Sequence, residues 1–170
     1  MKRPPRIRRS TSLLEVAAHN RVLEVGYGAG LAILDLMERD VDIRVVGIDR
    51  SATMIERARR NIEAAGHNRV ELRHTDLASM TSEVGQFDVI FAINVNAFWT
   101  NGSAEIAALK TLLASHGHIW LFYEPPAPAK IDDIIERLRT NMQNAGFAVT
   151  VVAEERAMPP FLAMSAALRS

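Results

Sequence analysis

Residues 22–30 constrain the fold more than any other part of the chain; they read Val-Leu-Glu-Val-Gly-Tyr-Gly-Ala-Gly. The apolar residues predict a buried strand that carries an acid, Glu24, near its end. Glycine at every second position after the strand lets the backbone turn sharply and bring its N–H groups close to a ligand. Residues 31–37 have helical spacing, so the glycines join a strand to the start of a helix. Such a corner is typical of proteins that bind nucleotide-type ligands.

The spacing of the glycines differs from that of dinucleotide-binding loops. They stand at Gly26, Gly28 and Gly30, whereas dinucleotide-binding loops read G-x-G-x-x-G. Here Leu31 fills the place of the third glycine. A glycine turn that holds no ligand would also explain the three residues, so the motif needs support from elsewhere in the chain.

Support comes from three later apolar segments, each of which ends in a polar residue. They are predicted strands at residues 44–49, 71–76 and 87–94, ending in Asp49, Asp76 and Asn94. Segments of helical spacing follow at 51–66, 103–113 and 131–145, and a fifth strand is predicted at 119–123. Alternation of strands and helices predicts a parallel sheet covered by helices on both faces. In such sheets ligands bind outside the carboxyl ends of the strands.

The C-terminal region differs from this alternation. Residues 147–152 and 161–168 predict two strands separated only by a loop. A connection without a helix favours antiparallel pairing. We therefore predict a doubly wound α/β fold in one domain, with a mostly parallel, seven-stranded sheet and an antiparallel C-terminal strand pair.

Composition limits the class of protein. The 170 residues have a formal net charge of +0, which gives no overall attraction for nucleic acid. No apolar run approaches the length of a membrane span, and the N-terminus lacks the apolar core of a signal peptide, so we expect a cytoplasmic protein with no membrane partner. Cysteine is absent and the five histidines are scattered, so no metal site is expected.

The first residues are strongly basic: Lys2, Arg3, Arg6, Arg8 and Arg9. We expect residues 1–11 to form a flexible, solvated arm. The alternative is an arm that touches an acidic substrate or folds over the active site. Residues 12–15 match a capping box and predict a short helix that opens the domain of residues 12–170.

With these residues together, the chain resembles the class I S-adenosylmethionine-dependent methyltransferases from about Leu13 to the C-terminus. The resemblance implies S-adenosylmethionine as cofactor and S-adenosylhomocysteine as product. It implies that Glu24 and the glycine backbone hold the methionine part, that Asp76 and Leu77 read the adenine edge, and that Met54 packs on its face. The implied cofactor-binding residues are Glu24, Gly26, Gly28, Gly30, Asp49, Arg50, Met54, Asp76, Leu77 and Asn94.

Asp49 also has a role that follows from its position. It stands about twenty residues after the glycine loop, where an acid in dinucleotide folds binds the ribose hydroxyls. Several of these residues could instead serve the fold alone. Asp49 and Ser51 could only cap a helix, Asp76 could cap a turn, and Met54 could belong to the core.

The methyl acceptor is expected beside residues 94–99, Asn-Val-Asn-Ala-Phe-Trp. This segment lacks the Asn/Asp-Pro-Pro-aromatic pattern of relatives that methylate exocyclic or amide nitrogens. No His–Asp pair or lysine stands out as a base. The candidates for a catalytic role are Asn94, Glu124 and Tyr27, whereas His116 and His118 should lie at the wrong end of the sheet.

The sequence favours a methyltransferase with a small-molecule acceptor. Because no lid is visible, a homodimer or a partner subunit could complete the open site. Other hypotheses are a non-catalytic cofactor-binding subunit, an RNA- or protein-directed methyltransferase, and a nicotinamide-dependent oxidoreductase. The last is disfavoured by the glycine spacing and by the second acid, Asp76.

Overall fold

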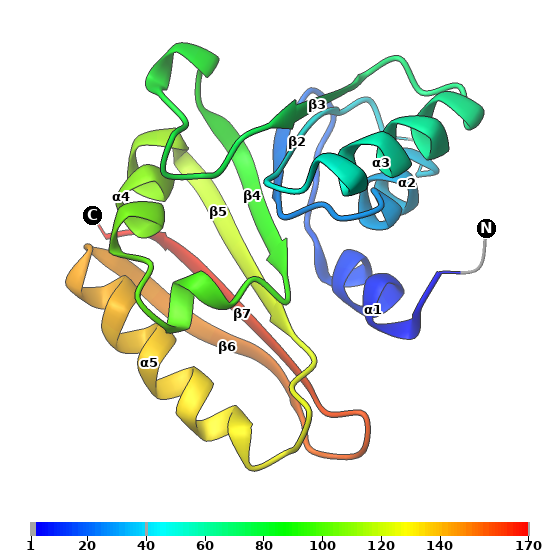
Figure 1. Ribbon diagram of the computed structural model, residues 1–170. Helices are drawn as coiled ribbons and strands as arrows, with labels where there is room; N and C mark the ends of the chain where they lie inside the picture. Colours follow the sequence, from blue (N-terminus) through cyan, green and yellow to red (C-terminus); the bar gives the residue numbers. More distant parts are fainter. Residues whose placement is uncertain (1–2, 40, 170) are drawn as a thin grey trace.

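The computed structural model describes residues 3–39 and 41–169, and its centre is one seven-stranded sheet (Figure 1). The strand order is β3-β2-β1-β4-β5-β7-β6. The strands span Arg21–Val25 (β1), Arg44–Asp49 (β2), Val70–His74 (β3), Phe87–Ile93 (β4), Leu113–Tyr123 (β5), Phe147–Glu155 (β6) and Phe161–Leu168 (β7).

The direction of the strands confirms the predicted fold class. Strands β1 to β5 pair in parallel, and β7 runs antiparallel to both β5 and β6. The order reverses at β1, which lies between β2 and β4. In a doubly wound sheet, the crevice at such a reversal point is where ligands bind.

Helices cover both faces of the sheet. They span Pro5–Leu13 (α1), Leu31–Met37 (α2), Ala52–Ala64 (α3), Ser103–Leu112 (α4) and Lys130–Asn144 (α5), with short 3-10 helices at Ser82–Val84 (η1) and Asn96–Trp99 (η2). Leu109 of α4 and Leu138 of α5 are buried in one core, whereas Ile33 of α2 and Ala58 of α3 are buried in the other. In the described residues, no helix is both long and apolar enough to cross a membrane.

The N-terminus departs from the expectation. The predicted capping box does not open a helix, because α1 has already formed and ends at Leu13. Pro5 suits the first helical position, since its missing N–H would be unpaired there in any residue. Ile7 is buried in the same core as α2, and Arg3 forms ion pairs with Asp35 and Glu38. The boundary expected after residue 11 therefore falls inside a docked helix, while residues 1–2 of the expected arm lie outside the described residues.

Two strands are longer than their apolar cores indicated. β5 begins at Leu113 instead of Ile119, and its early part pairs with β4 through an irregular register. β6 continues to Glu155 because β7 supplies a pairing partner along its whole length. In both cases backbone hydrogen bonding extends the strand through residues that carry no apolar pattern.

Candidate active site

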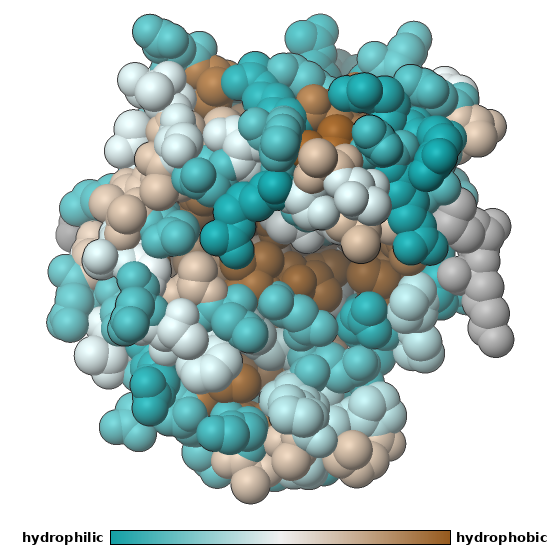
Figure 2. Space-filling model, viewed as in Figure 1, coloured by the Kyte–Doolittle hydropathy of each residue, from teal (hydrophilic) through white to brown (hydrophobic). Residues whose placement is uncertain are grey.

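The carboxyl ends of β1, β2 and β4 surround a cavity of about 390 Å³. Figure 2 shows a hollow near the middle of this face, with hydrophobic atoms on its floor and hydrophilic residues around it. The cavity is lined by Val25, Gly26, Ile48, Asp49, Arg50, Thr75, Asp76, Leu77, Asn94, Val95, Asn96, Ala97, Phe98 and Glu105. Six of the predicted cofactor-binding residues are among them: Gly26, Asp49, Arg50, Asp76, Leu77 and Asn94.

The glycine loop forms the turn between β1 and α2. Gly26 has a φ of +73°, in the left-handed region that glycine adopts without steric cost. A Cβ added there would lie 2.8 Å from Cγ2 of Val95, so the loop and the segment after β4 pack too closely for any side chain. The backbone N–H of Gly26 donates to the carbonyl of Ile48, 2.8 Å away, which ties the loop to the end of β2.

Asp49 ends β2 and contacts both the glycine loop and the start of α3. Its Oδ2 accepts a hydrogen bond from the N–H of Gly28, and its Oδ1 accepts one from the N–H of Ser51, both at 2.8 Å. Ser51 in turn caps α3 by accepting from the N–H of Met54. The helix-capping interpretation is therefore correct for this segment. It does not exclude ligand binding, because each carboxylate oxygen keeps a further lone pair and Asp49 lines the cavity.

Glu24 lies in β1, two residues before Gly26, and is not among the residues that line the cavity. Its residue is only 3% exposed, and its Oε2 has no hydrogen-bond partner. Burial raises the pKa of Glu24 to about 8; the nearby charge of Asp49 adds to the rise, and a hydrogen bond from the backbone of Ile33 opposes it. A buried carboxyl with an open acceptor is costly unless a ligand or water donates to it.

On the adenine side expected from the resemblance, Asp76 and Leu77 follow β3. The Oδ1 of Asp76 accepts from the N–H of Ser79 at 2.8 Å, so this acid does cap a turn. The hydrogen bonds from Ser79 lower the pKa of Asp76, and the positive charge of Arg50 contributes in the same direction. Leu77 is buried and lines the same cavity as Asp76.

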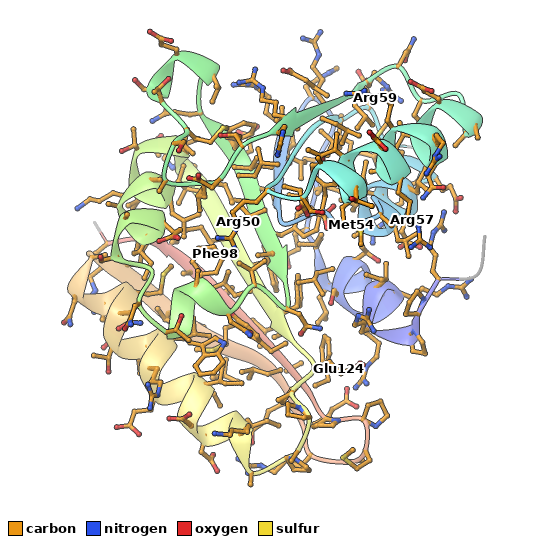
Figure 3. The ribbon with its side chains drawn as sticks, in the orientation of Figure 1. Arg50, Met54, Arg57, Arg59, Phe98 and Glu124 are labelled. Carbon is orange, nitrogen blue, oxygen red and sulfur yellow. The ribbon has the colours of Figure 1, made fainter. Side chains whose placement is uncertain are left out.

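Four predicted cofactor-binding residues lie outside the lining of this cavity: Glu24, Gly28, Gly30 and Met54. The N–H of Gly28 donates to Asp49, which does line the cavity, and Gly30 is the N-cap residue before α2. Met54 is half-buried and lies near the start of α3 (Figure 3).

Asn94 lies where β4 ends and takes a strained backbone conformation with φ of +57°. Asparagine tolerates this left-handed region better than most residues, and such residues cluster at functional sites. Its backbone N–H donates to the carbonyl of Phe122, and its Oδ1 accepts from the N–H of Glu124, both at 2.8 Å. Asn94 therefore joins the ends of β4 and β5.

A second cavity, of about 350 Å³, adjoins the first and shares Asn94 and Asn96 with it. Its lining is completed by Trp99, Tyr123, Glu124, Pro125, Pro126, Lys130 and Ile134. The sequence pointed to Trp99, Asn96 and Glu124 near the acceptor, but it did not indicate Tyr123, Lys130 and Ile134. Pairing of β5 with β4 brings Tyr123 next to Asn94, and packing of α5 against η2 brings Lys130 and Ile134 there, so no local sequence pattern predicts these positions.

Tyr27 is the catalytic candidate that the geometry does not support. Its residue is 3% exposed, it packs against Gly47 of β2, and it lines neither cavity. Burial raises the pKa of its hydroxyl to about 12. His116 and His118 lie with Asp88 in a separate cavity at the other end of the sheet, as expected.

Glu105 was missed as well. It lies in the first turn of α4 and lines the first cavity beside the residues that follow β3. Acidic residues are common on the solvent-facing side of helices, so the sequence alone does not indicate that Glu105 lines a cavity.

The sheet order and the antiparallel β5-β7-β6 end, with a cavity at the reversal point, are those of the class I methyltransferase fold. Residues 22–117, more than half of the chain, match the family model described as a methyltransferase domain. The chain therefore belongs to this methyltransferase family.

Individual relatives agree with this assignment. The uncharacterized methyltransferase YdaC of Bacillus subtilis is 22% identical over 138 residues, which cover 79% of this chain and 75% of that protein. A solved structure of a putative S-adenosylmethionine-dependent methyltransferase from Listeria monocytogenes superposes with a TM-score of 0.74 at 16% identity, covering 97% of this chain and 99% of that one.

A third relative was solved with product bound. Magnesium protoporphyrin IX methyltransferase from Synechocystis, with bound S-adenosylhomocysteine, superposes with a TM-score of 0.70 at 18% identity, covering 89% of this chain and 75% of that one. The protein is thus an S-adenosylmethionine-dependent methyltransferase, and the predicted family, fold and cofactor are confirmed.

Proposed function

We propose that this protein transfers the methyl group of S-adenosylmethionine to a small-molecule acceptor bound in the second cavity. The observation that carries the proposal is the meeting of two cavities at Asn94. The first has acids and backbone donors around it, and the second has aromatic and proline walls. A donor site and an acceptor site must meet at one point for direct transfer between them.

The residues of the first cavity fit the cofactor. S-adenosylmethionine brings hydrogen-bond donors on its ammonium, its ribose hydroxyls and its adenine amine. Glu24 has a buried oxygen without a partner, and Asp49 lines the cavity with further acceptor capacity on its carboxylate. We assign Asp49 to the ribose, Asp76 and Leu77 to the adenine edge, and Glu24 with the backbone of Gly26 to the methionine part.

The remaining predicted residues take supporting roles in this proposal. Arg50 lines the cavity with Asp76, and Met54 packs against the adenine from α3. Gly28 orients Asp49 through its N–H, and Gly30 caps the start of α2. Asn94 holds the ends of β4 and β5 together where the two cavities meet.

When bound, the cofactor supplies a methyl group on a positively charged sulfur, which makes the methyl carbon open to attack by a nucleophile. The protein's part is mainly to align the two reactants, because orientation alone supplies several kcal/mol in such reactions. The cofactor cavity is formed by this chain alone, so binding of the cofactor should need no partner. Completion of the acceptor side by a second copy stays a prediction that size-exclusion chromatography with light scattering would test.

Calorimetric titration with S-adenosylhomocysteine, with NADH in parallel, tests the proposal. We expect saturable binding of S-adenosylhomocysteine alone. Asp49→Asn should weaken that binding at least about tenfold, because two hydroxyl donors lose their charged acceptor. Asp133→Asn, which changes an acid on α5 paired with Arg137, should not weaken it. Binding of NADH in place of S-adenosylhomocysteine, or full affinity in Asp49→Asn, would contradict the site assignment.

A further inference from the structure

The walls of the second cavity are mostly apolar. Trp99, Pro125, Pro126 and Ile134 supply flat or aliphatic surfaces, and Tyr123 presents a buried ring. The volume of about 350 Å³ is at the small end of the range for ligand cavities, ~300–1,000 Å³. Aromatic and proline surfaces at this size suit a planar molecule of one or two rings.

Most polar groups of this cavity already have partners. The Oδ1 of Asn94 accepts from the N–H of Glu124, and the Oδ1 of Asn96 accepts from Nε1 of Trp99 at 3.2 Å. The hydroxyl of Tyr123 donates to the carbonyl of Val95 at 2.9 Å. These contacts fix the shape of the cavity and leave none of the three oxygens as a free base.

Glu124 differs from them. Of the described residues that line this cavity, it alone carries a carboxylate. Its side chain is 22% exposed, and its Oε1 lies 3.7 Å from Nη1 of Arg6 on α1. That separation gives electrostatic attraction without a hydrogen bond, so both oxygens keep their acceptor capacity. The other charged or titratable groups around it are Lys130 on α5 and the buried hydroxyl of Tyr123.

A free carboxylate selects among acceptor chemistries. Beside an amine it stabilises the ammonium form, which has no lone pair with which to attack. Beside a carboxylate acceptor it repels. A hydroxyl group, in contrast, donates a hydrogen bond to the carboxylate and can pass its proton there as the oxygen attacks.

We propose that the acceptor is a small aromatic alcohol, held in the second cavity with its hydroxyl group on Glu124. This inference rests on the proposed function. The acceptor oxygen forms a bond to the methyl carbon, the carbon–sulfur bond breaks with its electron pair left on sulfur, and the hydroxyl proton passes to an Oε of Glu124 and then to solvent. Arg6, from a helix that the sequence placed in a flexible arm, lies 3.7 Å from this carboxylate and attracts it electrostatically.

A binding assay tests this without any transfer of methyl. The chain has two tryptophans, so Trp120→Phe leaves Trp99 as the fluorescent reporter of the cavity. In this background p-cresol should quench Trp99 and bind more tightly than 4-methylanisole, which has the same shape but no hydroxyl donor. Glu124→Gln should reduce that preference about fivefold, because a charged acceptor becomes neutral.

Glu155→Gln is the matched control. Arg9, also on α1, pairs with Glu155 outside the cavity, so this variant removes a neighbouring ion pair without touching the proposed acceptor site. It should keep the wild-type preference for p-cresol. Equal binding of p-cresol and 4-methylanisole to the Trp120→Phe protein would overturn the inference.

A methyl-transfer series adds a kinetic test. Glu124→Gln should lower the rate about 100-fold or more with p-cresol, a weak acid that needs a base. It should lower the rate less than about tenfold with p-nitrophenol, which ionises readily by itself. An equal loss with both phenols would indicate a structural role and overturn the inference.

Matched acceptors separate this inference from the proposed function. Benzylamine and benzoate analogues of p-cresol should not be methylated, because the first is an ammonium ion beside the carboxylate and the second is repelled by it. Methylation of either analogue, or no transfer to any member of the series while S-adenosylhomocysteine still binds, would overturn the acceptor class alone. Failure of S-adenosylhomocysteine to bind would overturn the proposed function instead.

Discussion

The buried carboxyl of Glu24 makes the stability of the protein depend on pH in a direction opposite to that of most acids. Its pKa rises from 4.5 to about 8 on folding, chiefly because burial disfavours the charged form. Between these values the unfolded chain has lost the proton while the folded protein keeps it. Stability therefore falls as pH rises through this window.

The size of the effect follows from the same values. A rise from 4.5 to about 8 corresponds to about 5 kcal/mol at ~1.36 kcal/mol per pKa unit, lost between pH 4.5 and somewhat above pH 8. Over the practical range from pH 6 to pH 8, integration of the linkage gives a loss of about 2 kcal/mol.

Glu24→Gln isolates this contribution, because glutamine has nearly the same shape and does not ionise. Urea denaturation of both proteins at several pH values gives the difference in unfolding free energy, in which other titrating groups cancel. Relative to the variant, the wild type should become less stable by about 2 kcal/mol from pH 6 to pH 8. Glu56→Gln, at an exposed position of α3, should show no such trend. A difference that is constant or grows with pH would refute the reasoning.

Three further predictions concern the ligand, the glycine loop and α1. If the cofactor's ammonium pairs with ionised Glu24, S-adenosylhomocysteine should bind several-fold more tightly at pH 8 than at pH 6.5, and calorimetry should show no such gain in Glu24→Gln. In urea denaturation, Gly26→Ala should lower the free energy of unfolding by about 2 kcal/mol more than Gly66→Ala does. Both glycines have φ of +73°, but only a Cβ at residue 26 would clash with Val95. Equal losses in the two variants would show that Val95 moves aside. Arg3→Ala should lower the melting temperature by roughly 2–4 °C, since ~1 kcal/mol of contacts with Asp35 and Glu38 is lost; an unchanged melting temperature would mean that α1 docks through Ile7 alone.

Local patterns in the sequence determined the framework of the site. Apolar runs that end in Asp49, Asp76 and Asn94 predicted parallel strands, and their carboxyl ends do line one cavity. The prediction succeeded because strand burial and glycine turns depend on residues close in sequence. The parallel order also fixes which end of each strand faces the ligand, and this separated His118 from the site correctly.

Only the tertiary structure decided the second cavity and the role of the N-terminus. Arg6 reaches Glu124 across more than a hundred residues of chain, and Tyr27 turns into the core although it stands in the glycine loop. Such contacts depend on which helix packs on which face of the sheet. The spacing of apolar residues within one segment does not predict which distant segment it will contact. The sequence by itself therefore determined the sheet, its glycine corner and the acids along its edge. Long-range packing decided which of those acids are buried, which are free, and what surface meets the methyl acceptor.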